Sequence, residues 1–241
     1  EISVVFLGGV NYYNGQVLDM ERITKKAQQY GIMVGYDLAH AVGNIELKLH
    51  DWGVDFATWC SYKYLNAGPG GISGIYVHER YFTNHKMRRM AGWWGHDEKT
   101  RFSMPTKYVP SYGAEAWQQS NIPIFQAAAL KASLDLFTAA KMPQLRAKSL
   151  QLTGYLIYLL QSIPQKAFTI LTPLEDLQRG AQLSLFFEKG GKEVFEQLGK
   201  QGVVVDWREP NVIRLAPAPM YNNYEDVFRF YEILLRILSQ E

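Results

Sequence analysis

The first eighty residues alternate strand-like and helix-like patterns, and this alternation limits the possible folds more than any other feature of the chain. Short apolar runs predict four strands, at residues 4–7, 32–36, 54–60 and 72–77. Between the first two, apolar side chains recur at helical spacing from Met20 until Gly31, and Asp19 is a plausible N-cap for that helix. Strands and helices in this order predict an α/β fold with a mostly parallel sheet.

The pattern changes after residue 80. Residues 80–121 are irregular and rich in aromatic residues, Gly and Pro. Loops of that length are usually functional or disordered, and the aromatic content argues against disorder. A long helical stretch follows from Pro123 to about Ser162, and we expect a break or kink near Met142-Pro143.

The second half of the chain has a different mixture of elements. Its patterns predict strands at 184–187, 203–206 and 212–215, and helices at 194–200 and 224–238. Asn223 is a credible cap for the last helix. We therefore expect part of a large α/β domain at residues 1–123, and a linking helix with a smaller α+β domain at residues 124–241.

Two polar residues follow neighbouring strands of the predicted sheet. Asp37 ends the strand at 32–36, and Lys63 comes shortly after the strand at 54–60. In open α/β sheets, ligands bind outside the carboxyl ends of the strands. A carboxylate and a lysine there suit pyridoxal phosphate, because the carboxylate keeps the pyridine nitrogen protonated and the lysine forms a Schiff base. From the spacing alone, a helix-capping Asp and a solvated Lys remain the more common interpretation.

The residues around both positions carry a more specific signal. Residues 37–44 (DLAHAVGN) and 61–68 (SYKYLNAG) resemble the cofactor region of kynureninases, which belong to the class V group of fold-type-I pyridoxal-phosphate enzymes. Asp-x-x-His before Ser-x-Lys is shared with relatives such as cysteine desulfurases, but the longer strings are closer to kynureninases. The similarity is weakest between residues 163 and 192 and extends to four more strings, at 11–16 (NYYNGQ), 92–96 (GWWGH), 120–123 (SNIP) and 213–217 (IRLAP).

The resemblance implies roles for four residues of the two longer strings. Lys63 is similar to the lysine that holds the cofactor as a Schiff base, and Asp37 to the partner of the pyridinium nitrogen. His40 resembles the residue beside the ring; without the motif, a hydrogen-bonded core histidine would be the default. Tyr62 resembles the tyrosine that contacts the cofactor phosphate and relays a proton during cleavage, whereas an aromatic residue near a strand end is otherwise more often a packing residue.

Further roles are implied outside these strings. Trp93 and Asn121 match other cofactor-site positions of the family, Asn121 also near the substrate, and His96 is a candidate for touching the substrate's aromatic ring. Arg214 matches the arginine that binds the substrate carboxylate. A guanidinium binds a carboxylate with two parallel hydrogen bonds and therefore suits this role better than an ammonium. Its alternative is an ion pair at the surface. The family often has a serine where Gly8 stands, so Gly8 is not taken as a ligand.

The resemblance implies an activity and an assembly. Kynureninases hydrolyse L-kynurenine or 3-hydroxykynurenine to anthranilate or 3-hydroxyanthranilate and L-alanine, in tryptophan degradation and NAD precursor synthesis. Fold-type-I enzymes usually build each active site from two subunits, so we expect a homodimer with shared sites. The alternatives are another class V enzyme, such as a cysteine desulfurase or an aminotransferase, and a non-catalytic dimerisation fragment. A desulfurase needs a mobile cysteine, and Cys60 lies inside a predicted strand.

The chain opens directly on a predicted strand, whose backbone groups need neighbours. We therefore expect an upstream part, which in the family supplies an aromatic ring stacked on the cofactor, phosphate-binding hydroxyls and a further acid. Without that part, the 241 residues would hold half of a cofactor pocket, and we expect them to be inactive alone.

Composition excludes several other classes. The net charge is +2 without a long run of one sign, so nothing indicates binding to nucleic acid or to a membrane surface. The single cysteine excludes an internal disulfide and favours a cytoplasmic setting. The five histidines lack zinc spacing, so we expect no metal site, and no apolar run is long enough to span a bilayer.

Overall fold

In the computed structural model, which describes residues 1–84, 87–164 and 167–239, the chain divides into two units. Unit 1 comprises residues 1–8, 19–42 and 47–135, and unit 2 comprises residues 9–18, 43–46 and 136–241. The predicted domain boundary after residue 123 falls at the start of helix α2 (Ile124–Ala140), and the division between the units falls within that helix. Residues 85 and 86 of the predicted irregular segment lie outside the described residues.

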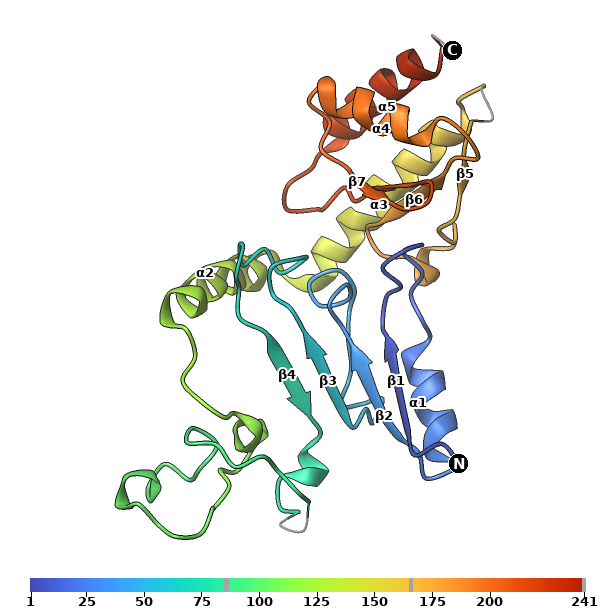
Figure 1. The fold of residues 1–241 in the computed structure, drawn as a ribbon. Coiled ribbons are helices and arrows are strands. Elements are labelled where there is room, and N and C mark those ends of the chain that lie inside the picture. Colours follow the sequence, from blue (N-terminus) through green and yellow to red (C-terminus); the bar gives the residue numbers. More distant parts are fainter. Residues whose placement is uncertain (85–86, 165–166, 240–241) are drawn as a thin grey trace. The chain divides into compact units, whose positions relative to one another are not determined.

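Unit 1 contains a sheet with the strand order β1-β2-β3-β4. Its strands are β1 (Val4–Gly8), β2 (Met33–Asp37), β3 (Phe56–Trp59) and β4 (Gly74–Val77). The pairs β1–β2 and β2–β3 are parallel, whereas β3 and β4 are antiparallel. In Figure 1 the arrows of β1, β2 and β3 therefore point to one edge of the sheet, and that of β4 points to the other. The predicted mostly parallel sheet is confirmed.

Helix α1 (Met20–Gln28) covers part of this sheet and begins where the sequence predicts. The Asp19 carboxylate accepts a hydrogen bond from the backbone N–H of Arg22 at 3.0 Å, which satisfies one of the open donors of the first turn. Met20 and Thr24 are the buried residues of the helix. The Thr24 hydroxyl lies 3.1 Å from the hydroxyl of the buried Tyr36, so a polar contact fixes α1 on β2.

A buried carboxylate near the amino-terminal ends of β2 and β3 connects three parts of unit 1. Asp55, which is 4% exposed, accepts hydrogen bonds from the backbone N–H of Val34 at 2.7 Å and from the Tyr81 hydroxyl at 2.5 Å. The Arg80 guanidinium lies 3.5 Å from the same carboxylate. Burial, followed by the hydrogen bond to Asp55, raises the pKa of Tyr81 to about 12. Asp55 thus links β2, β3 and the turn after β4.

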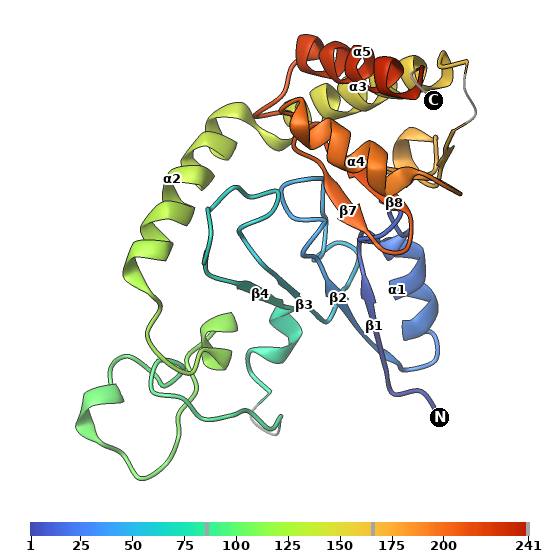
Figure 2. The same ribbon diagram turned by 45° about the horizontal axis from the view of Figure 1, so that its top comes forward.

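The segment after β4 is irregular, as predicted, apart from three short 3-10 helices, η1 (Glu79–Tyr81), η2 (Arg101–Ser103) and η3 (Ala114–Trp117). Because β4 runs against its neighbour, it returns the chain to the edge opposite the carboxyl ends of β1, β2 and β3. Figures 1 and 2 show the green segment at that opposite edge, before α2 leads the chain back.

Unit 2 contains the second sheet, with the strand order β5-β6-β8-β7 and antiparallel pairing throughout. Its elements are α3 (Met142–Gln161), β5 (Thr169–Ile170), η4 (Asp176–Gln178), β6 (Leu183–Phe186), α4 (Gly191–Lys200), β7 (Asp206–Arg208), β8 (Val212–Leu215) and α5 (Tyr224–Leu238). The three helices and one face of the sheet enclose an apolar core that includes Leu152, Leu198, Ile213 and Leu234. Unit 2 therefore has the predicted mixture of helices and an antiparallel sheet.

Two details of unit 2 test the predicted elements. The expected break between the long helices is confirmed, because Lys141 has a left-handed backbone (φ 62°) between α2 and α3. The expected strand at 203–206 is wrong, since the paired strand is Asp206–Arg208. Val204 is 97% exposed, and its neighbours Val203 and Val205 pack against the core without strand pairing. The hairpin with β8 sets the register here and overrides the β propensity of the valines.

None of the helices within the described ranges is long and apolar enough to cross a membrane.

We predict that Asp55→Ala destabilises the protein, because it leaves the Val34 N–H and the Tyr81 hydroxyl buried without an acceptor. Each such donor costs about 1–3 kcal/mol. The free energy of unfolding in urea measures the loss. Asp51→Ala is the matched control, since the Asp51 side chain is 73% exposed, and it should change stability little. Equal stability of both variants would contradict the assigned role of Asp55.

Candidate active site

Asp37 lies at the carboxyl end of β2, beside the end of β3. The two strands pair in parallel with Asp37 opposite Thr58, so the chain leaves both strands at the same edge of the sheet. The backbone N–H of Leu38 donates to the carbonyl of Thr58 at 2.8 Å and extends this pairing. The Asp37 carboxylate is exposed and accepts from the backbone N–H of Ala39 at 2.9 Å, which fixes the turn after the strand.

Lys63 and His40 meet at this edge. The Lys63 Nζ lies 3.1 Å from Nε2 of His40, and both side chains are partly buried. Lys63 is held in a tight turn, because its carbonyl accepts from the backbone N–H of Asn66 at 3.0 Å. The carbonyl of Leu65, in the same turn, accepts a hydrogen bond from the buried Ser133 hydroxyl of α2. The structure therefore brings together two residues that the sequence places in separate strings.

Tyr62 completes the group at this edge. Its side chain is 52% exposed. A side-chain hydrogen bond with Cys60 raises the pKa of Tyr62, with further contributions from the charge of Cys60, from desolvation and from the Asp37 carboxylate. Like an ordinary tyrosine, the phenol carries its proton at neutral pH, and the raised pKa makes it a weaker acid than usual.

Ser61 lies next to these residues and is the serine of the Ser-x-Lys motif, although the sequence analysis assigns it no role. Its side chain is fully buried, and among the described residues its hydroxyl has no hydrogen-bond partner. A buried polar group without a partner is rare and calls for an explanation such as a bound ligand. A carboxylate, an amine, an imidazole, a phenol and this hydroxyl at one sheet edge fit a heteroaromatic aldehyde that carries a phosphate.

Trp93 and His96 lie together in the irregular segment, at the opposite edge of the sheet. They line a pocket of about 330 Å³ with Arg101 and Tyr108. His96 is 8% exposed; its Nε2 lies 3.1 Å from the Thr100 hydroxyl, and its Nδ1 accepts from a backbone N–H. Both ring nitrogens are thus occupied within the segment, and a polar contact with a ligand would have to displace one of these partners.

The remaining predicted residue of unit 1, Asn121, is exposed just before α2. Trp93 is 46% exposed and packs edge-on against Phe102, with ring centroids 5.5 Å apart. Neither side chain is joined by a described contact to Lys63 of the same chain.

Arg214 lies on β8 of unit 2 and is 9% exposed. Its Nη1 donates to the carbonyl of Tyr12 at 2.6 Å, and its Nη2 forms an ion pair with the carboxylate of Asp206. Arg214 therefore does form an ion pair, as the alternative interpretation from sequence has it, but its own side chain is nearly buried rather than at the surface. The sequence patterns do not identify Asp206 as the partner of Arg214. The signal that could have identified it is the hairpin of β7 and β8, in which the two residues lie directly opposite each other.

Comparison with known proteins agrees with the motifs at this edge. Residues 145–234 match the family model described as the kynureninase C-terminal domain. A kynureninase of Myxococcus xanthus is 53% identical over 234 residues, covering 97% of this chain and 55% of that protein. A kynureninase of Christiangramia forsetii is 50% identical over 244 residues, covering 100% of this chain and 57% of that protein.

The chain belongs to the kynureninase family. It spans about half the length of the curated kynureninases that it matches.

Solved structures show which fold this member of the kynureninase family shares. A cysteine desulfurase from Thermococcus onnurineus has a TM-score of 0.80 at 17% identity, covering 99% of this chain and 60% of that chain. An alanine–glyoxylate aminotransferase from Nostoc sp. has a TM-score of 0.74 at 20% identity, covering 98% of this chain and 62% of that chain. The predicted fold class, that of the fold-type-I pyridoxal-phosphate enzymes, is thereby confirmed.

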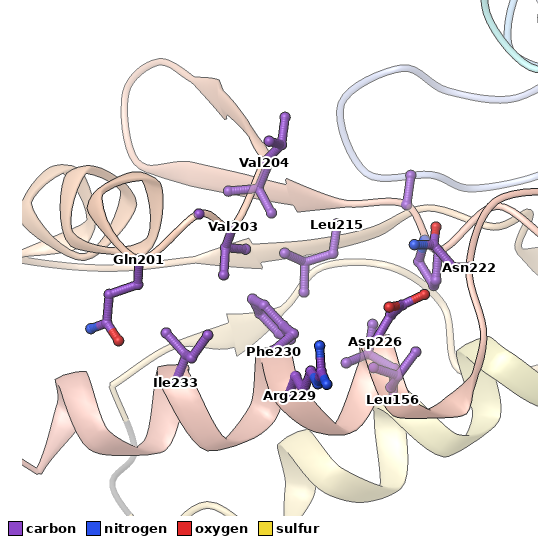
Figure 3. A pocket seen from close by; sticks show the side chains of 15 residues that line it. Leu156, Gln201, Val203, Val204, Leu215, Asn222, Asp226, Arg229, Phe230 and Ile233 are labelled. Carbon is purple, nitrogen blue, oxygen red and sulfur yellow. The ribbon is translucent and has the colours of Figure 1, made fainter.

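A pocket of about 520 Å³ lies within unit 2, between residues 201–205 and α5 (Figure 3). Apart from Gln201, its polar side chains form contacts within unit 2. Asp226 forms the capping box of α5 with Asn223, Arg229 pairs with Glu225, and Asn222 accepts from a backbone N–H. The other lining residues are mostly apolar, so this pocket holds no group for the chemistry of the kynureninase family.

We predict that Cys60→Ala lowers the pKa of Tyr62 toward the ordinary tyrosine value of about 10, because it removes the hydrogen bond that raises it most. The phenolate absorbance followed against pH measures this shift, and Tyr62→Phe identifies the contribution of Tyr62. Cys60→Ser keeps a hydrogen-bonding side chain and serves as control. An unchanged titration in Cys60→Ala would refute the contact.

Proposed function

We propose that a chain of full family length carrying this sequence is a pyridoxal-phosphate enzyme that hydrolyses L-kynurenine, or its 3-hydroxy form, to anthranilate (or 3-hydroxyanthranilate) and L-alanine. In this role it serves tryptophan degradation and NAD precursor synthesis. The observation that carries the proposal is the pairing of Lys63 with His40 beside Asp37, at the carboxyl ends of parallel strands. The identity of about half of all residues to kynureninases along nearly the whole chain supports the substrate.

Pyridoxal phosphate supplies an electron sink when it is bound. Lys63 is the residue that we propose to bind its aldehyde, and Asp37 the carboxylate that favours a protonated pyridine nitrogen. His40 would lie beside the ring, and Tyr62 would reach the phosphate. Trp93 and Asn121 are the further cofactor-binding residues of the proposal; the indole of Trp93 is only a donor, which suits a phosphate.

Two of these residues also handle protons. The Lys63 amine would accept the proton that is removed from the substrate's α-carbon, and its 3.1 Å contact with His40 offers a route by which that proton moves on. Tyr62 keeps its proton at neutral pH and is half exposed at the same edge. It is therefore suited to protonate the alanyl carbon after the carbon–carbon bond breaks.

Three residues are proposed to bind the substrate. Arg214 would bind its carboxylate, and His96 and Asn121 would contact its aromatic part. The buried guanidinium of Arg214 supports the first assignment, because a partly desolvated cation attracts a carboxylate more strongly than an exposed one. His96 would use its ring, since both nitrogens already have partners.

We also propose a homodimer with shared active sites. The irregular segment starts at the sheet edge opposite Lys63, so Trp93 and His96 are better placed for the site of another copy. The segment also exposes several large apolar side chains, which is typical of an interface: Met90, Phe102, Met104 and Tyr112 are each more than 70% exposed.

The rival activities receive less support. A desulfurase needs a mobile cysteine, and Cys60 follows directly on the last residue of β3, one residue beyond the strand rather than inside it as predicted. It is partly buried and hydrogen bonded to Tyr62, which leaves it little freedom. This single free thiol also supports the proposed cytoplasmic location.

Lys63→Ala in the full-length enzyme should abolish the formation of anthranilate from L-kynurenine, because both the cofactor link and the base are lost. Chromatography of the products measures the activity. Lys48→Ala, at an exposed position, is the control and should retain it. A Lys63→Ala variant with normal turnover would contradict the proposed function, as would a wild-type enzyme that releases alanine from cysteine and leaves kynurenine intact.

Shared sites predict complementation between two inactive subunits. Lys63→Ala and Trp93→Ala enzymes, unfolded and refolded together in equal amounts, should recover about a quarter of the wild-type activity, because half of the dimers are hybrids with one intact site each. Each variant refolded alone is the control. Recovery no greater than the sum of these controls would show that Lys63 and Trp93 serve the same subunit's site, or none.

A further inference from the structure

Arg214 stands in a row of polar side chains across the second sheet. On β8 it is directly opposite Ser184 of β6 and Asp206 of β7. Residues opposite each other on neighbouring strands point to the same face of a sheet, and adjacent residues point to opposite faces. Its neighbours Ile213 and Leu215 belong to the apolar core with the helices. The row therefore lies on the face that the helices do not cover.

The backbone carbonyls of Tyr12 and Tyr13 bind to this face through other side chains besides Arg214. The Ser184 hydroxyl donates to the carbonyl of Tyr13 at 2.6 Å. The Gln182 amide donates to the carbonyls of Tyr12 and Tyr13 at 3.1 and 3.2 Å. Removal of one partner of Arg214 would therefore leave this segment in place, and the sheet is not expected to unfold.

The guanidinium of Arg214 is held from two sides. Nη1 donates to the Tyr12 carbonyl, and Nη2 binds the carboxylate of Asp206. Nε is buried and has no hydrogen-bond partner among the described residues. An arginine has five donors in a planar fork. The two contacts thus fix the plane of the fork, while Nε still lacks an acceptor within the described part of the chain.

The charge of Arg214 is not neutralised by Asp206 alone. The same carboxylate oxygen lies 3.1 Å from Nη2 of Arg208, so two guanidinium groups share one carboxylate. The cluster keeps one net positive charge, which a second carboxylate would balance. If Asp206 were paired with Arg214 alone, it would neutralise the Arg214 charge and weaken the attraction of Arg214 for another anion.

We propose that Asp206 is a positioning residue, which holds the Arg214 guanidinium in the orientation that binds the α-carboxylate of the amino acid substrate. This inference rests on the proposed function, in which Arg214 binds that carboxylate. Asp206 touches no substrate itself. It acts by fixing the fork, while Arg208 keeps the cluster cationic.

The test measures binding of two probes to the cofactor-loaded enzyme of full family length by calorimetry. L-Alanine has the carboxylate, and L-alaninamide lacks its charge. Asp206→Ala should weaken L-alanine binding about tenfold, as expected for the loss of a charge-assisted contact, and alaninamide binding hardly at all. Asp206→Asn retains an acceptor oxygen and should recover part of the loss. In the Arg214→Ala enzyme, Asp206→Ala should have no further effect.

Glu225→Gln breaks an exposed Glu–Arg pair elsewhere in unit 2 and is the matched control, with no change for either probe. Circular dichroism checks that all variants fold. An equal loss for both probes would mean that Asp206 only supports the fold, and this would overturn the proposal. Unchanged L-alanine binding in Asp206→Ala would overturn it too, as would a wild-type enzyme that does not prefer L-alanine. Kynurenine cleavage is assayed separately, so its absence counts against the proposed function and not against this inference.

Discussion

The parallel pairing of β2 with β3 is the constraint on which the candidate site depends. Because both strands run in the same direction and Asp37 lies opposite Thr58, the chain leaves both at one edge of the sheet. Two turns, each fixed by backbone hydrogen bonds, then place His40 and Lys63 within 3.1 Å of each other. The buried carboxylate of Asp55 stabilises this pairing from the opposite end, through the backbone of Val34.

Much of unit 1 could be predicted from the sequence because its signals are local. The apolar runs, the Asp19 cap and the glycine at the end of α1 each act within a few residues. Asp37 and Lys63 could be found for the same reason, since a polar residue after a buried strand of a parallel sheet lies at the ligand-binding edge. The motif around them also indicates the family, which the spacing of apolar residues alone cannot indicate.

The parts that the sequence could not supply depend on contacts between distant residues. Residues 9–18 belong to unit 2, where Ser184 and Gln182 hold them, although they lie between two elements of the first sheet. The valines before β7 have high β propensity, yet the hairpin with β8 excludes them from the sheet. The partner of Arg214 was missed because it depends on that same register.

We propose that the sheet edge at Asp37 and Lys63 is the cofactor site, and identifying the lysine that carries pyridoxal phosphate tests this directly. Borohydride reduction of the loaded enzyme of full family length attaches the cofactor permanently to that lysine, and peptide mapping by mass spectrometry locates it. The label is expected on Lys63. A label on another lysine, or no label on any, would contradict this proposal.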